Sequence, residues 1–528
     1  MNATDNTAGM SRRDFFGSSA AAISAAAAVP AGAKAGLIAA ELAPLDCAMP
    51  AQLTVKPVVS GILHEAAFEG SYRTGEVGRL TAAAESQLLN RRFDALRREL
   101  SQLSPPDGVI FLEPAIIRQR VSRANAGMAL ETDHLERLAG DDPATGAYLV
   151  LGGGIPQYTC LQLAERYRKP VILAGVPSWG TDAPAGLRSR GLEGYYTRGW
   201  EETNRLLRLL QVRQAFRNTR VLCVGGAPGQ PPPGVISAIT DLDGLERRYG
   251  LSFLHLGYRE FFSEMDRLLA QPLTRAAARQ IAGELIAGAR QVGMQRRDVE
   301  NSVLYYLAVR RAMHEHGCNA FSDECFELCG TAIPWRRRFT PCLTHALLKD
   351  AGHPSASESD FNALLAMAAL MFLAGKSVHM GNPDIEPGGN LLELRHSDLG
   401  LRLKGFGQPA PEYDIHSFTA AGFGATFRYD FSEDEGQPVT LARFHPRGDR
   451  ILVSSGAIAG GGCLTGCGCS QRVQVAIPDG RQLLRQLQNF GHHLTLVYGD
   501  FTEDIEDLGD VMGFETVALT PARSRGIA

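Results

Sequence analysis

Two carboxylates, Glu358 and Asp360, come directly before a strongly apolar run that begins at Phe361. Burial beside such a run, together with the repulsion between two negative charges, shifts the proton affinity of carboxyl groups. Carboxylates in this setting can bind a metal ion or transfer protons. The same residues also fit the start of a helix, because Ser357-x-x-Asp360 offers side chains that cap a helix N-terminus. Both interpretations stay open at this point.

Histidines recur further along the chain at the ends of expected elements. His396 ends an alternating apolar run, and His492 and His493 come directly before a strand expected at 494–498. A single histidine in such a place is more often a strand end or a satisfied buried group, whereas the neighbouring pair favours a ligand. Carboxylates combined with one imidazole suit manganese, magnesium or iron(II) better than an all-sulfur site would.

Short motifs follow one another in a defined order through the second half of the chain. They are Cys325-Phe326-Glu327-Leu328, Thr340-Pro341-Cys342, Gly352-x-Pro354, Glu358-x-Asp360, Gly375-Lys376, Asn382-Pro383, His396, Pro438-Val439-Thr440-Leu441 and Gly491-x-His493 with Tyr498-Gly499-Asp500. Their order and spacing resemble the L-fucose isomerase and L-arabinose isomerase superfamily. The resemblance is densest from Cys318 to the C-terminus, and the first half shares the general α/β pattern.

The resemblance implies a divalent ion, usually manganese, and the interconversion of an aldose with its ketose. In that family a glutamate, an aspartate or second glutamate, and a histidine near the C-terminus hold the ion. Carried onto this sequence, the ligands are Glu327, Asp360 and His493, with Glu324 as the alternative to Glu327. Glu327 and Asp360 are also the expected proton-transfer residues. Substrate contacts are expected from Glu358, Trp335, His396 and His492.

These residue types suit the chemistry of sugar isomerisation. A base must remove a proton from the carbon next to a carbonyl, while a positive group stabilises the charge that develops on the enediolate oxygens. A carboxylate can serve as the base, and a divalent ion can stabilise the oxygens. Residues 330–338 do not match the family, so the identity of the sugar stays open. Within them, Arg336-Arg337-Arg338 fits a solvated loop or, alternatively, a clamp for an anionic sugar.

The N-terminus carries a second strong signal. Ser11-Arg12-Arg13-Asp14-Phe15-Phe16 and the alanine-rich run through Val29 resemble a twin-arginine export signal. We therefore expect residues 1–35 to be a leader recognised by the twin-arginine export machinery, and the mature protein to be periplasmic or secreted. The alanine-rich run is short for a stable bilayer span.

Composition is that of an ordinary soluble globular protein. The 528 residues are 45% hydrophobic and 21% charged with a net charge of −4, which argues for several domains and against a nucleic-acid partner. Cys463, Cys467 and Cys469 form a C-x3-C-x-C group that matches no strong zinc or iron–sulfur pattern. We expect buried free thiols, and a single disulfide formed after export or a bound cluster are the alternatives.

Three regions have to position these side chains. In residues 52–200, strand-like runs such as 55–59, 148–151 and 170–173 alternate with amphipathic stretches, which predicts a parallel sheet. Residues 201–345 repeat this pattern, and a strand expected at 319–328 would carry the candidate glutamate. In residues 346–528, short β-like runs predict antiparallel pairing. The predicted fold is α/β, with two doubly wound parallel-sheet domains followed by an antiparallel β-barrel-like C-terminal domain.

Together these patterns predict an exported, metal-dependent aldose–ketose isomerase. The resemblance also implies a homo-oligomer, a trimer or hexamer. Two alternatives remain, namely a periplasmic sugar-binding protein without turnover and a metal-dependent epimerase or lyase that acts on a sugar derivative.

Overall fold

The computed structural model describes residues 44–64, 81–121, 130–133, 135–151, 156–226, 228–462 and 466–519. These residues form two compact units. The N-terminal unit spans Pro50–Gln214, and the C-terminal unit contains the described residues before Pro50 and after Gln214. The expected leader lies outside the described residues. Among the helices of the described residues, none has both the length and the apolar character that crossing a bilayer requires.

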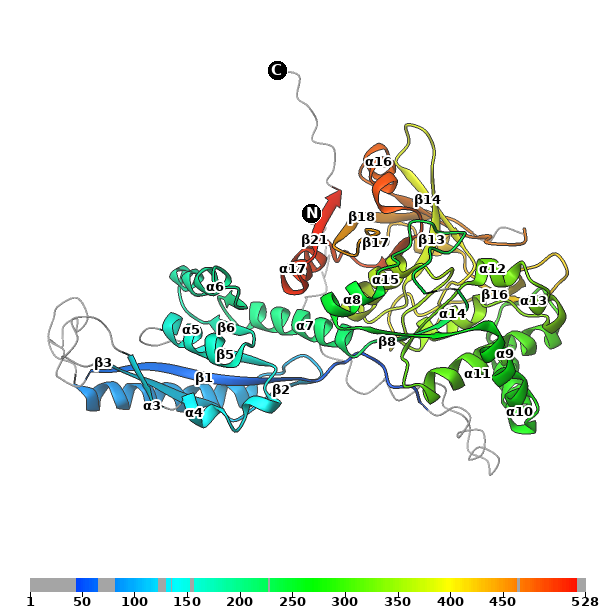
Figure 1. Cartoon of the computed structure of the whole chain (residues 1–528). Helices are drawn as coiled ribbons and strands as arrows, with labels where there is room; N and C mark the ends of the chain where they lie inside the picture. The colour runs from blue at the N-terminus through cyan, green and yellow to red at the C-terminus, as the bar shows by residue number, and fades with distance from the viewer. Residues whose placement is uncertain are drawn as a thin grey trace, which may run out of the picture. The chain divides into compact units, whose positions relative to one another are not determined.

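The N-terminal unit is built on one mostly parallel sheet (Figure 1). Its strand order is β4-β3-β1-β5-β6-β7, with β2 also paired to β1, and only the β3–β4 pair is antiparallel. The strands are β1 Leu53–His64, β2 Val109–Phe111, β3 Ala115–Val121, β4 Leu130–Asp133, β5 Ala147–Leu151, β6 Val171–Ala174 and β7 Gly194–Thr197. Parallel neighbours need crossover connections, which helices supply. The α-helices are α3 Ala82–Gln102, α4 Leu135–Leu138, α5 Pro156–Tyr167, α6 Asp182–Arg188 and α7 Trp200–Arg217.

The C-terminal unit begins with a second parallel sheet, of strand order β12-β11-β8-β9. Its strands are β8 Arg220–Val224, β9 Ser252–Leu256, β11 Ala320–Asp323 and β12 Ser355–Ala356. The helices of this part are α8 Leu242–Tyr249, α9 Tyr258–Leu269, α10 Pro272–Gly288, α11 Arg296–Glu315, α12 Cys325–Cys329, α13 Ala332–Arg337 and α14 Cys342–Asp350. A small sheet of order β10-β15-β16 joins Gln291–Val292, Asp414–Ser417 and Ala425–Arg428.

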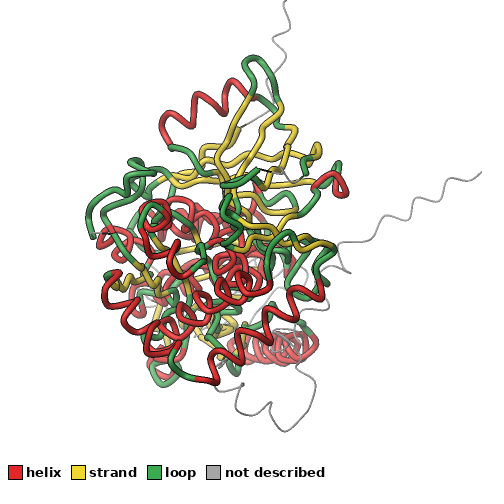
Figure 2. Tube along the Cα trace, turned by 90° about the vertical axis from the view of Figure 1, so that its right-hand side faces the viewer, coloured by secondary structure: helices red, strands yellow, loops and turns green. Residues whose placement is uncertain are grey.

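Six antiparallel strands of the same unit close into a barrel. The ring is β17-β20-β13-β14-β19-β18, and it closes because β17 pairs with both β20 and β18. Its strands are β13 His379–Ile385, β14 Leu391–His396, β17 Pro438–Phe444, β18 Arg450–Gly460, β19 Gln471–Ala476 and β20 Leu494–Tyr498. β21 Glu515–Leu519 adds to β18 in parallel, and α16 Gly480–Phe490 and α17 Thr502–Met512 flank the last strands. Figure 2 shows the barrel strands of this unit gathered in yellow. The predicted fold class is confirmed.

The helix α15 Phe361–Ala374, which is apolar except for Asn362, links the parallel sheet to the barrel. It contacts β12 of the sheet and β17 and β20 of the barrel, and twelve of its fourteen residues are buried. Asp360 caps its first turn and Gly375 ends it in a left-handed conformation. A helix that is apolar on all sides is buried on all sides. The residues that precede α15 are therefore held between the two sheets.

Candidate functional site

Glu358 lies in a strained turn that follows β12. Glu358 and Ser359 both have left-handed backbone angles, with φ of 64° and 51°. Such angles are costly for residues other than glycine and persist only where the surrounding structure enforces them. The amide of Ser359 donates to the Asp323 carbonyl at 2.9 Å, which ties the turn to the end of β11. Strain of this kind is concentrated at functional sites.

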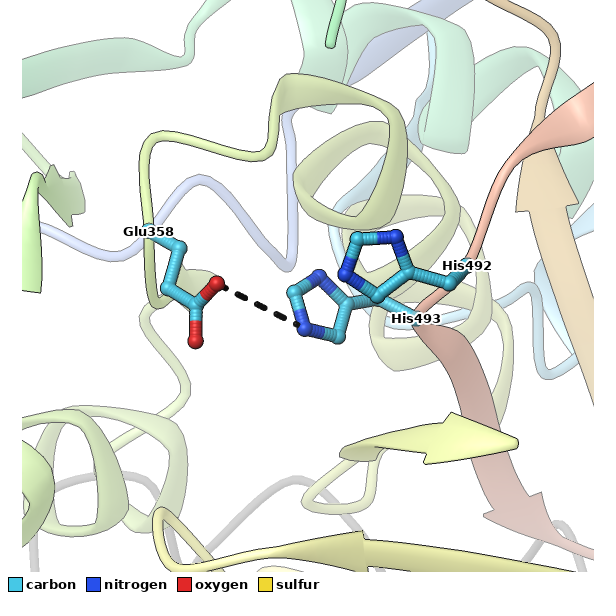
Figure 3. A group of neighbouring side chains, drawn as sticks. All are labelled: Glu358, His492 and His493. Carbon is cyan, nitrogen blue, oxygen red and sulfur yellow. Dashed lines mark ion pairs between the residues drawn. The ribbon is translucent and has the colours of Figure 1, made fainter. Parts of the chain in front are cut away.

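The second component of the site is a pair of histidines before β20. His493 is fully buried, has φ of 67°, and places its Nε2 3.8 Å from Oε2 of Glu358. Figure 3 shows this ring directed at the carboxylate, with the His492 ring beside it. The ligand atoms of Glu358, His492 and His493 all lie within 4.8 Å of one another. This is a spacing at which one metal ion could be bound by all three.

Asp360 orients His493 from behind. Its Oδ2 accepts hydrogen bonds from Arg443 Nη1 at 2.7 Å and from His493 Nδ1 at 2.9 Å, and its Oδ1 accepts from the amide of Ala363 at 3.1 Å. Burial would raise the pKa of Asp360, but the Arg443 guanidinium and the His493 ring outweigh it and hold that pKa well below its usual range. A carboxylate bound to Nδ1 leaves Nε2 free to bind a metal. Nε2 of His493 has no hydrogen-bond partner among the described residues.

His396, the last residue of β14, approaches Glu358 from the other side. Its Nε2 lies 3.6 Å from Glu358 Oε1, and its ring centre is 5.5 Å from that of His493. Burial would lower the pKa of His396, but the neighbouring Cys469, Asp398 and Glu358 raise it well above its ordinary value. Burial likewise would raise the pKa of Glu358, which His396 and His493 instead lower. Two imidazoles thus flank one carboxylate.

The two candidate glutamates upstream are placed differently from the expectation. The strand expected at 319–328 ends at Asp323, and residues 325–329 form the short helix α12 instead. Glu324 stands directly after β11 and is 4% exposed, whereas Glu327 is exposed on the helix. Burial and the proximity of Glu327 raise the pKa of Glu324. Because β11 and β12 are parallel neighbours, Glu324 and Glu358 follow the same carboxyl edge of the sheet.

Trp335 and the basic cluster occupy the surface. Trp335 is 62% exposed on α13 and makes an edge contact with Phe423 at 5.6 Å between ring centres. Arg337 forms two hydrogen bonds with Asp266, at 2.6 and 2.9 Å. Arg338 forms two with Asp298, at 2.6 and 2.8 Å. These two arginines are therefore engaged within the protein, which disfavours the clamp interpretation for them.

The cysteines of the described residues are free thiols. Cys463 lies outside the described residues, and Cys467 and Cys469 belong to a loop that follows it. The main chain on both sides of Cys469 is bound to Ser397, because Ser397 Oγ donates to the Gly468 carbonyl and accepts from the Ser470 amide. The expectation of buried free thiols is met for Cys160, Cys223 and Cys318, whereas the other six described cysteines are free but exposed or only partly buried.

Sequence reasoning did not find three residues that support the site, namely Lys349, Asp398 and Arg443. All three are charged and fully buried. Asp398 follows His396 by two residues, which was the one signal available in the sequence. Lys349 and Arg443 reach the site from other elements, so spacing along the chain did not point to them.

Comparison with known proteins adds to this geometry. No model of a known protein family matches the chain. Proteins named sulfoquinovose isomerase from Priestia aryabhattai and Priestia megaterium are each 25% identical to it over 325 residues, which cover 59% of this chain and 68% of each relative. The chain is a distant homologue of these isomerases. This homology supports the prediction of a sugar isomerase, while the metal ion, the oligomer and export stay predictions.

Proposed function

We propose that this protein is a divalent-metal-dependent isomerase that interconverts an aldose and a ketose. One observation carries the proposal: Glu358 stands in an enforced left-handed turn and is flanked by His493 Nε2 at 3.8 Å and His396 Nε2 at 3.6 Å. Neither nitrogen has a hydrogen-bond partner among the described residues. Buried polar atoms are nearly always satisfied, so nitrogens left open around a carboxylate fit a bound cation.

In this proposal Glu358 and His493 hold the ion, and His492 or His396 completes the set. Manganese, magnesium or iron(II) suits these oxygen and imidazole donors. When bound, such an ion stabilises negative charge that develops on the sugar oxygens during proton transfer. Asp360 fixes His493 for this task, which gives it a role beside its predicted one as a ligand.

Glu324 is the side chain we favour for proton transfer. A base works best when its pKa lies near the working pH, and both burial and Glu327 raise the pKa of Glu324. It follows the same sheet edge as Glu358, and in this proposal the sugar binds at that edge. Glu327, the residue predicted from the family motif, lies one helical turn further along α12 and is exposed.

The distant relatives suggest a sugar with a sulfonate group as the first substrate to test. We therefore propose an assay of metal-stripped protein, with and without Mn²⁺, on sulfoquinovose, uronic acids and neutral aldoses, with ketose followed by NMR. Conversion should require the metal and stop on addition of EDTA. Glu358→Gln should lower kcat/KM by about 100-fold or more, because it removes a charged ligand. Exposed Glu386 offers the matched control, Glu386→Gln, which should keep full activity.

Two results would contradict the proposal. Turnover unchanged by EDTA would remove the metal from the mechanism. Saccharide binding without conversion across the whole panel would favour the alternative of a sugar-binding protein.

We also propose that the protein is exported in folded form and assembles as a homo-oligomer. The arginine pair Arg12-Arg13 supports the export route, and Arg12→Lys with Arg13→Lys should retain the protein in the cytoplasm of its host. Fractionation with an antibody would measure this. Light scattering of the purified protein would report the oligomeric state.

A further inference from the structure

Asp398 is the centre of a buried charged cluster behind the site. It is fully buried, and its Oδ2 accepts a hydrogen bond from Ser357 Oγ at 2.9 Å. Its Oδ1 lies 3.2 Å from Lys349 Nζ and 3.3 Å from His396 Nδ1. His379 Nδ1 lies 3.9 Å from the same oxygen. The four groups come from α14, the turn before Glu358, β14 and β13.

A cluster of this kind is expensive for stability alone. Removing a carboxylate and an ammonium group from water costs several kcal/mol for each, and replacing such a pair by apolar residues is often neutral or stabilising. Lys349 compensates the charge of Asp398, with its Nζ 3.2 Å from Asp398 Oδ1, and both side chains are fully buried. A functional role of the carboxylate would explain why this pair is buried in the interior.

The geometry connects Asp398 to both sides of the site. It contacts Ser357, the residue that precedes Glu358, and it contacts His396, whose ring faces Glu358. We propose that Asp398, held by Lys349 and Ser357, is a positioning residue that fixes the His396 ring with Nε2 directed at Glu358. The consequence for metal binding rests on the proposed function, whereas the orientation of the ring does not.

Asp434 provides an internal comparison. It is a largely buried carboxylate of the same unit, and it accepts hydrogen bonds from Tyr429 at 2.5 Å and Tyr498 at 2.9 Å and pairs with Lys404 at 2.8 Å. None of its contacts among the described residues involves Glu358, His396 or His493. Asp434→Asn therefore reports the general effect of losing a buried charge in this unit.

The first test is structural. Crystal structures of the wild type and of Asp398→Asn should differ at His396, whose ring should rotate away from Glu358 or adopt two orientations. An unchanged ring in the variant would overturn the proposal, whether or not the protein is an isomerase. Should Asp398→Asn not fold, Ser357→Ala removes only one of the contacts of Asp398 and should produce a smaller change in the same direction.

The second test measures Mn²⁺ affinity by electron paramagnetic resonance in a double-mutant cycle. With His396 as the third ligand of the proposed set, Asp398→Asn should weaken binding by about 10- to 100-fold, as expected for a residue that orients a ligand. In a His396→Ala background the same change should have less than about a twofold effect, because Asp398 acts through that ring. Equal losses in both backgrounds would overturn the proposal, and Asp434→Asn should leave the affinity unchanged. If the wild type binds no Mn²⁺, the proposed function fails and the crystallographic test alone decides.

Discussion

Asp360 unites two interpretations that its sequence context leaves open. The structure confirms that it caps α15, through the bond from the Ala363 amide. The same carboxylate binds the Arg443 guanidinium and the His493 ring. Its predicted role as a direct metal ligand stays a prediction. Both of its oxygens already accept hydrogen bonds from other groups. One side chain therefore links helix initiation to the orientation of a candidate ligand.

Asp360→Asn changes the side chain little in shape, but it should lower the free energy of unfolding substantially. The change leaves the fully buried Arg443 without its counter-charge, and breaking such a pair costs about 3–5 kcal/mol. Urea unfolding monitored by circular dichroism would measure the loss. Asp384 is exposed, so Asp384→Asn should change the free energy of unfolding by less than about 0.5 kcal/mol. Equal stability of the two variants would contradict the assigned role of Asp360.

Glu324 and Glu327 can be separated by a matched pair of variants. Glu324→Gln should lower kcat by about 10²- to 10⁴-fold if it transfers the proton, while KM changes little. Glu327→Gln changes an exposed side chain and should lower kcat by less than about threefold. Steady-state kinetics on the substrate found in the panel would decide between them. The reverse order of effects would restore the residue that the family motif favours.

At the scale of elements, long or strongly patterned segments were predictable and short ones were not. The apolar run at 361–374 predicted α15, and strand-like runs predicted β1, β5 and β6. Residues 319–328 were expected to be one strand because short apolar runs do not distinguish helix from strand. In the structure the buried strand ends at Asp323, and Cys325–Cys329 turn into a helix. That difference decides which of the two glutamates is buried.

The C-terminus of α15 offers a test at this scale. Gly375 has φ of 63° and an added Cβ would meet no atom within 4 Å, so only the backbone conformation opposes a side chain. Gly375→Ala should therefore lower the free energy of unfolding by about 1 kcal/mol. Gly283 lies inside α10, where Gly283→Ala should have the opposite sign and stabilise by up to about 1 kcal/mol once the flexible end of Arg296 shifts. Thermal unfolding of both variants would compare them.

For the whole molecule, the order of sheets and barrel could be predicted but the convergence of side chains could not. Periodicity indicated parallel sheets followed by antiparallel strands, and the structure confirms this order. Glu358 and His493 were singled out because each stands beside a recognisable pattern. Lys349 on α14 meets Asp398, which comes two residues after the end of β14, because these two elements pack together although they are separated along the chain. Local patterns contain no record of such distant contacts.

Buried histidines should make the folded protein sensitive to acid. Burial lowers the pKa of His353 to about 4 and that of His379 to about 3, whereas both return to about 6.5 on unfolding. Between pH 6.5 and 4 the unfolded chain thus binds protons that the folded protein does not. The free energy of unfolding should therefore decrease as the pH is lowered through this window, by about 1.4 kcal/mol per pH unit for each histidine.

Urea unfolding at pH 6.5, 5.5 and 4.5 would measure this slope. His353→Asn should reduce this slope by the contribution of one histidine, because asparagine does not bind a proton in this range. The asparagine amide can still donate to the Asn319 carbonyl that His353 Nδ1 contacts. The same change at exposed His314 should leave the slope as in the wild type. A slope that is unaffected by His353→Asn would contradict the effect of burial assigned to that residue.

Glu358 follows the last strand of the parallel sheet, β12, whereas His493 directly precedes the barrel strand β20. A cation bound by both residues would cross-link the parallel sheet to the barrel, the same two parts that α15 connects in the interior. Amide protons at the start of β20 and in the turn after β12 should then exchange with deuterium more slowly when Mn²⁺ is bound, with the distant edge strand β21 unaffected. Binding of the ion would therefore be detectable from slower amide exchange at these positions, even before any sugar is added.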